Sequence, residues 1–106
     1  MIYNFTQEEK KAIHTSFIVC LKKLKFTRKE RRFGERLCEK FNAASTTIRL
    51  KPVAFRKVAM ISILNLSVIE GALVSPEIEE EELKERVEQA HAILAKVVDK
   101  LEKGML

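Results

Sequence analysis

The chain is poor in the residues that build turns and disulfide frameworks. Its 106 residues include no tryptophan, 3 glycines, 2 prolines and 2 cysteines. A β-rich domain of this length normally needs more turn residues, so the composition argues against one. Two cysteines are too few for a disulfide framework. Because Cys20 and Cys38 both fall within apolar helical patterns, we expect buried, unreactive thiols.

Side chains that catalyse reactions are also scarce. The histidines are His14 and His91, and the single aspartate is Asp99. The glycines are isolated, so no glycine-rich loop can cradle a phosphate. The spacing shows neither a Ser–His–acid arrangement nor a Cys/His metal pattern. The sequence therefore predicts a protein that is not an enzyme and has no cofactor, metal or small-molecule substrate.

One short motif keeps a metal-binding helical bundle as an alternative. Glu88-Gln-Ala-His91 has the Glu-x-x-His spacing of carboxylate di-iron bundles. Such sites need two of these motifs and two further glutamates, all facing inward, so a symmetric dimer would have to supply the second. Val87 and Ala90 occupy the apolar face, which directs Glu88 away from it.

Long hydrophobic runs are absent. The longest, Val58 to Ile69, has 12 residues, whereas a membrane-spanning helix needs about 20. The N-terminal MIYNFTQEEKK does not have the basic segment and apolar run of a secretory signal. The composition, 46% hydrophobic and 33% charged, is that of a folded helical protein. We therefore expect a cytoplasmic protein that does not bind membranes.

Helix-start motifs and apolar periodicity predict one all-α domain over residues 1–106. Thr6-Gln-Glu-Glu9 and Thr27-Arg-Lys-Glu30 are capping boxes, which start helices. Pro52 and Ser75-Pro76 are typical of two further helix starts. The predicted architecture is a compact four-helix bundle-like domain with helices at about 6–26, 27–44, 52–74 and 75–103. Residues 42–52 could be a loop, a short helix or a strand.

The third and fourth predicted helices indicate which helix faces are buried in the bundle. The third, PVAFRKVAMISILNLSVIEGALV, is apolar nearly all round, so it should be central and need cover on most sides. Because it has too few polar positions for a solvent-facing side, we expect a homodimer. The fourth carries a heptad seam of about two and a half repeats, formed by Leu83, Val87, Ala90, Leu94, Val97 and Leu101.

Positive charge is concentrated in one stretch. Residues 22–36 hold eight cations and two acids, a net charge of +6 against +5 for the whole chain. Residues at i, i+4 lie on one face of a helix, so a ridge forms from Arg28, Arg32, Arg36 and Lys40. Like charges at this spacing repel, so the ridge is a candidate surface for an acidic partner. A solvated face that binds nothing is the alternative.

A second pattern lies just after the ridge. The segment from Leu37 to Leu50, LCEKFNAASTTIRL, resembles the helix-turn-helix core of bacterial winged-helix repressors. The resemblance implies that Thr46, Thr47 and Arg49 begin a recognition helix and face DNA, with the ridge on the phosphate backbone. It departs from that pattern at Ala44, where the usual residue is serine, and Pro52 would end the helix after two turns.

The sequence therefore favours one function and leaves another open. Residues 1–75 carry a net charge of +9 and residues 76–106 a net charge of −4. Such polarity can steer a partner or lay an acidic helix over a basic one. We predict a small interaction or regulatory module whose basic helix face binds an acidic protein. Nucleic-acid binding through the same face is the alternative.

Overall fold

Six elements follow one another along the chain in the computed structural model, which describes residues 2–42, 47–74 and 80–105. The predicted all-α class is confirmed, with four helices packed together and the apolar third helix in contact with the other three. The elements are β1 (Ile2–Asn4), α1 (Gln7–Lys23), α2 (Arg28–Lys40), β2 (Thr47–Arg49), α3 (Pro52–Leu73) and α4 (Glu81–Met105).

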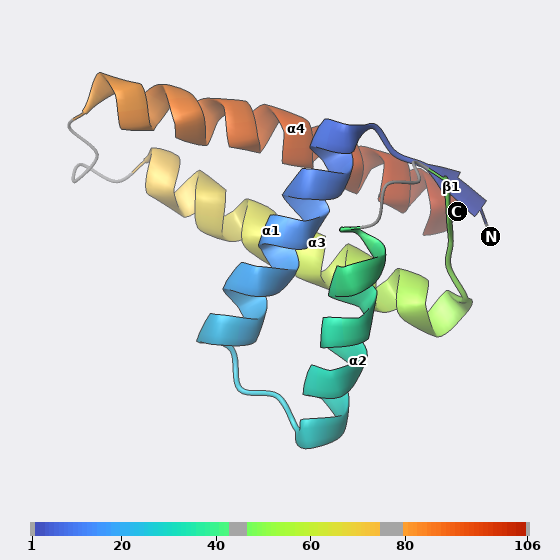
Figure 1. The fold of residues 1–106 in the computed structure, drawn as a ribbon. Coiled ribbons are helices and arrows are strands. Elements are labelled where there is room, and N and C mark those ends of the chain that lie inside the picture. Colours follow the sequence, from blue (N-terminus) through green and yellow to red (C-terminus); the bar gives the residue numbers. More distant parts are fainter. Residues whose placement is uncertain (1, 43–46, 75–79, 106) are drawn as a thin grey trace.

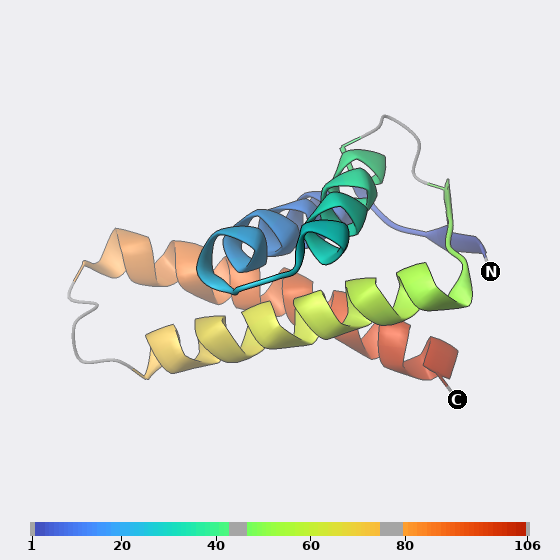
Figure 2. The ribbon, with the colours of Figure 1, turned by 90° about the horizontal axis from the view of Figure 1, so that it is seen from below.

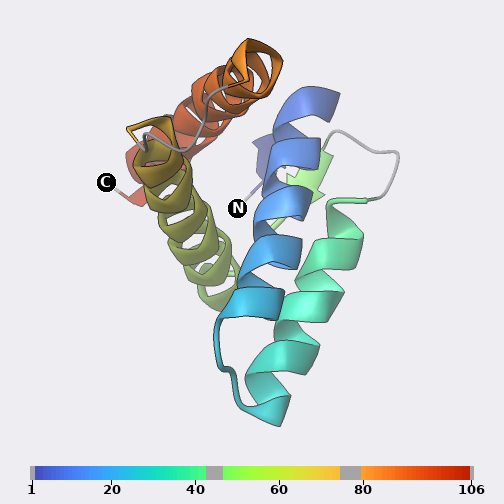
Figure 3. The same cartoon turned by 90° about the vertical axis from the view of Figure 1, so that its left-hand side faces the viewer.

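The helices form two crossed pairs. α3 and α4 run side by side, and α1 crosses over both of them (Figure 1). α2 lies beside α1, so that α1 and α2 make one layer and α3 and α4 the other (Figure 3). The end of α3 and the start of α4 extend past α1 at one end of the molecule, while both chain termini lie at the opposite end (Figure 2).

Both predicted capping boxes form and fix where α1 and α2 begin. The Glu9 N–H donates to Thr6 Oγ1 at 3.1 Å, and the Thr6 N–H donates to Glu9 Oε1 at 2.8 Å. Thr27 and Glu30 repeat the exchange at 3.2 and 3.1 Å. Each box satisfies backbone N–H groups that a helix start otherwise leaves without partners.

The helix ends differ from the predictions by a few residues. α1 ends at Lys23 rather than at 26, and α2 ends at Lys40 rather than at 44. α4 continues to Met105, past Gly104, where the sequence predicted it to stop. Its predicted start at Ser75-Pro76 lies outside the described residues. Helix ends fray, which makes them the least predictable part of a helix.

A two-stranded antiparallel sheet closes the end of the molecule that holds the termini. It pairs Ile2 with Arg49, Tyr3 with Ile48 and Asn4 with Thr47. The inward-facing Ile48 is buried, and Leu50, just after the strand, is fully buried. Within 42–52, Thr47–Arg49 is thus a strand and Pro52 already belongs to α3. The partner of this strand is the N-terminal segment, where no strand was predicted.

Aromatic side chains join the small sheet to the helices. Phe5 lies 6.0 Å from Tyr3 and 5.9 Å from Phe41, measured between ring centroids. Phe41 stacks in turn on Phe17 of α1 at 6.3 Å. Tyr3 stacks on Phe55 of α3 at 5.3 Å. Ring pairs at these separations add to the free energy gained by burying the rings themselves.

Two uncharged polar side chains of α3 face inward, while several large apolar ones face out. The Asn65 amide donates to Ser16 Oγ of α1 at 3.0 Å, and Ser62 is fully buried. On the other side, Val53 is 66% and Met60 41% exposed. The exposed set is completed by Ile63, Leu64 and Val68. The exposed side of α3 therefore mixes these apolar side chains with Arg56, Ser67 and Glu70.

The two buried polar residues of α3 should respond differently to truncation. Ser62 Oγ has no hydrogen-bond partner among the described residues, so Ser62→Ala should leave the free energy of unfolding unchanged or raise it by up to about 1 kcal/mol. Asn65→Ala removes a buried hydrogen bond and should cost about 1–2 kcal/mol. Urea unfolding of both variants measures the difference, and equal losses would contradict the expectation.

By length and apolar composition alone, α3 is able to cross a membrane, and 39% of its most apolar window is buried. The core helix of a globular protein meets the same two criteria. Here α3 packs against α1, α2 and α4, and the rest of its surface is exposed.

Candidate functional site: a basic groove between α2 and α3

Two adjoining hollows lie between α2 and the first half of α3. One has a volume of about 600 Å³ and the other about 460 Å³. Phe33 and Val53 line both, so the two hollows form one continuous surface, which we call the basic groove. Its apolar floor is made by Phe33, Leu37, Pro52, Val53, Ala54 and Met60.

Cations surround this floor. Among the described residues, four cations and no acid line the larger hollow, and three cations and one acid, Glu30, line the smaller. The cations are Lys29, Arg36, Lys40, Arg49, Lys51, Arg56 and Lys57. They come from three places in the chain, namely α2, the strand and link before α3, and the first turns of α3. The groove is thus electropositive and apolar at the same time.

The start of α3 adds to the positive potential. Lys51 is the N-cap residue and forms no side-chain cap, and Pro52 follows as the first helical residue. The first intrahelical bond runs from the Phe55 N–H to the Lys51 oxygen at 2.8 Å. A helix start carries a partial positive charge, which acids in the first turn usually offset. α3 has no acid in its first turn, and its Val53 and Ala54 line the larger hollow.

Some of this charge is already used within the fold. Lys57 Nζ lies 3.8 Å from Glu30 Oε2 and 4.8 Å from the centroid of the Phe26 ring. The hydrogen bonds from Thr27 and the charge of Lys57 lower the pKa of Glu30, so this carboxylate stays ionised at neutral pH. Lys40 lies in the last turn of α2, where it offsets the negative helix end. Among the described residues, the cations of the larger hollow form no ion pair, although Arg36 Nε donates to the Arg32 oxygen at 3.4 Å.

The predicted ridge divides into two halves in the structure. Arg36 and Lys40 line the groove, whereas Arg28 and Arg32 do not, although all four side chains are exposed. The basic stretch also holds a structural cation, because Arg31 Nη2 donates to the Leu21 oxygen at 2.8 Å and ties α2 to α1. Only the second half of the ridge therefore belongs to the groove.

The helix-turn-helix interpretation of residues 37–50 is wrong in its structural part. Thr47 and Arg49 lie in the strand β2 and not in a recognition helix, and Thr46 lies outside the described residues. Thr47 Oγ1 donates to Asn4 Oδ1 at 2.9 Å, which places it in the sheet. Pairing with the N-terminal strand, which the local motif does not contain, decides the conformation. Arg49 nonetheless reaches the groove beside Arg36.

Sequence reasoning missed the contributions of Lys51, Arg56 and Val53 to this site. One signal was available for Lys51. Helix N-caps are usually Ser, Thr, Asp or Asn, and a lysine directly before Pro52 places a cation at the positive end of a helix. A cation at that position is repelled by the positive end of its own helix. Such a repulsion is typical of a surface that binds an anion.

Thiols and potential metal ligands do not converge on the groove. Cys20 Sγ donates to the Ile61 oxygen at 3.8 Å and Cys38 Sγ to the His14 oxygen at 3.9 Å. Burial raises the pKa of both thiols, and the charge of Glu39 adds to the effect at Cys38, so both are protonated at neutral pH. Among the described residues, no three His, Cys, Asp or Glu side chains are grouped so as to hold a metal.

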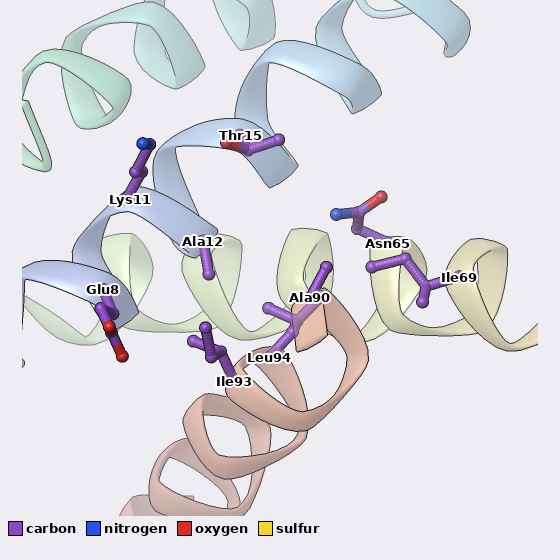
Figure 4. Close-up of a pocket in the computed structure, with 9 residues that line it drawn as sticks. All are labelled: Glu8, Lys11, Ala12, Thr15, Asn65, Ile69, Ala90, Ile93 and Leu94. Carbon is purple, nitrogen blue, oxygen red and sulfur yellow. The ribbon is translucent and has the colours of Figure 1, made fainter. Parts of the chain in front are cut away.

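A separate apolar hollow of about 330 Å³ lies where α1 crosses α3 and α4. Ala12, Ile69 and Leu94 surround it, and the charged ends of Glu8 and Lys11 point away from its centre (Figure 4). Among the described residues that line this hollow, these two exposed ones alone are titratable. The hollow therefore has few polar groups that could bind a ligand.

Comparison of the chain with protein-family models, with curated proteins and with solved structures finds no match.

Proposed function

We propose that this protein is a non-enzymatic interaction module whose basic groove binds an acidic segment of a protein partner. The observation that carries the proposal is the groove itself, in which seven cations and one acid surround an apolar floor. Apart from Glu30, the charged groups that line it are lysines and arginines. These suit the binding of carboxylates, which arginine holds through two parallel hydrogen bonds.

The floor favours a protein partner over a nucleic acid. A phosphate backbone needs cations but has no apolar groups to cover Val53 and Met60, which are both exposed at the groove. An acidic helix or strand with apolar residues on one face would bury these side chains and pair its carboxylates with the rim. Burial of the floor would contribute free energy of binding, while the rim would mainly speed encounter and select the partner.

Binding of a synthetic acidic peptide tests the proposal. The probe is a fluorescent amphipathic peptide of glutamates with leucines at i, i+3 and i+4 spacing, and the readout is anisotropy against protein concentration. The double variant Arg36→Glu/Lys40→Glu should bind on the order of 100-fold more weakly than wild type, because it places like charges against the peptide. Circular dichroism verifies that the variant is folded.

The matched control is Arg28→Glu/Arg32→Glu, which makes the same charge change on the same helix outside the groove. It should weaken peptide binding much less than the groove variant, because Arg28 and Arg32 line neither hollow and act on the peptide only through their field. Equal weakening by both variants would show that the ridge, and not the groove, is the binding surface. An oligonucleotide that binds more tightly than the peptide, with affinity falling steeply as salt rises, would instead establish the nucleic-acid alternative.

A further inference from the structure

The same chain carries a surface that complements the basic groove. At the start of α4, Glu80, Glu81 and Glu82 are exposed, and Glu85 follows one turn later. Leu83, in the middle of these acids, is 47% exposed. In the heptad seam, Leu94, Val97 and Leu101 are buried as predicted, whereas Leu83 is not. Residues 80–86 hold four glutamates together with Lys84 and Arg86, a net charge of −2, and Glu82 pairs with Arg86 at 3.5 Å. The start of α4 is therefore acidic overall and has an exposed leucine.

Within one molecule the two surfaces lie too far apart to touch. The groove includes the start of α3, whereas α4 begins beside the other end of α3 (Figure 1). A helix rises 1.5 Å per residue, so the 22 residues of α3 separate its ends by about 33 Å. An acidic α4 start can reach a basic groove only in another copy of the chain.

We propose that the groove of one molecule binds the acidic first turns of α4 of a second copy. The inference rests on the proposed function, because it names the acidic segment that the groove takes. Glu81 and Glu85, which lie four residues apart on one face of α4, meet the rim cations. These rim cations are Arg36, Lys40, Arg49 and Lys51 of the larger hollow, which, unlike Lys57, form no ion pair among the described residues.

Two further observations favour a second copy over an unrelated partner. Charge complementarity is built into one chain, with a net +9 on residues 1–75 and −4 on residues 76–106. The outer face of α3, which begins at the groove, is also apolar, at Val53, Met60 and Leu64. In a two-fold dimer each molecule supplies one groove and one α4 start, so both contacts form twice and the assembly closes.

Charge exchange between two variants tests the inference. One variant is Arg36→Glu/Lys40→Glu in the groove, and the other is Glu81→Lys/Glu85→Lys in α4. Analytical ultracentrifugation over a range of concentrations should show wild type at twice its 12.2 kDa mass. Each variant alone should dimerise on the order of 100-fold more weakly, because like charges then face each other. An equimolar mixture should regain a dimer, since its opposite charges pair again.

Arg28→Glu/Arg32→Glu is the control and should dimerise like wild type. A wild type that stays monomeric at the highest concentration overturns the inference, as does a dimer that persists in both variants. Neither result decides the proposed function, which the peptide titration tests with a separate probe and a different readout. Failure to self-associate can therefore be told apart from failure to bind an acidic peptide.

Discussion

Phe5→Ala should lower the free energy of unfolding by about 3–5 kcal/mol, although Phe5 belongs to none of the four helices. Its side chain is 1% exposed and contacts three separate parts of the fold. The ring lies 6.0 Å from Tyr3 of β1 and 5.9 Å from Phe41 at the end of α2. Lys100 of α4 places its ammonium 5.2 Å from the ring centroid. Alanine leaves a cavity at the point where these elements meet.

Urea unfolding followed by circular dichroism measures the loss. Ile2→Ala is the control, because Ile2 lies in the same segment but is 60% exposed, and it should cost less than about 1 kcal/mol. If Phe5→Ala were as mild as the control, the N-terminal segment would not be part of the cooperative fold. In that case its pairing with β2 would have no energetic importance.

The helices could be predicted because their determinants are local. Each of the boxes at Thr6 and Thr27 lies within four consecutive residues and satisfies its own backbone groups. Apolar periodicity then selects which face is buried, as it does for Ile13, Phe17 and Leu37. The sheet could not be predicted in this way. Each strand has three residues, too few for an alternating pattern, and pairs with a segment more than forty positions away.

The groove could be predicted only in part, unlike the helices, which could be predicted, and the sheet, which could not. Arg36 and Lys40 were named from their helical spacing, and Arg49 from a helix-turn-helix likeness that the strand contradicts. Spacing along one helix cannot tell which end of a ridge faces a neighbouring helix. The crossing of α2 and α3 decides it, and that crossing brings the segment before α3 against the second half of the ridge. The site is therefore a product of packing, although its charges are visible in the sequence.

The distribution of polarity on α3 links the fold to the proposed self-association. A core helix usually buries its apolar face and exposes its polar one. Here Ser62 and Asn65 are buried against the other helices, and Met60 and Leu64 face out. Burying polar groups and exposing apolar ones both cost stability in an isolated molecule. Cover from a second copy would remove the second cost, which is the physical reason to expect one.

Glu9→Gln should lower the free energy of unfolding at neutral pH by about 1–3 kcal/mol, since the carboxylate serves two parts of the fold. It caps α1 and also accepts from Lys100 Nζ of α4 at 3.0 Å. Lys100 donates to the Asn4 oxygen of β1 at 3.0 Å as well. One carboxylate thus ties α1, α4 and the sheet together, and glutamine keeps the shape but not the charge.

The loss of stability caused by Glu9→Gln should also depend on pH, and the surroundings of Glu9 determine the direction of that dependence. Burial raises the pKa of Glu9, but the hydrogen bonds from Thr6 and Lys100 and the charge of Lys100 outweigh it, so the net pKa is lowered. A carboxylate with a lowered pKa in the folded state contributes its full stability above its unfolded pKa, which is about 4.3. That contribution is lost as the pH falls through the folded value. Wild type should therefore lose its advantage over Glu9→Gln as the pH falls below about 4.

Glu30→Gln separates the two roles of Glu9, which are capping a helix and linking it to α4. Glu30 forms the same capping box, but on an exposed helix start. Its one ion pair among the described residues is with Lys57, at 3.8 Å. Glu30→Gln should cost less than Glu9→Gln at pH 7. Denaturant unfolding of wild type and both variants between pH 3 and pH 7 measures these differences. A gap between wild type and Glu9→Gln that stays constant down to pH 3 would mean that shape, and not charge, stabilises this position. Equal losses from the two glutamates would mean that the cap alone matters and that the link to Lys100 contributes nothing.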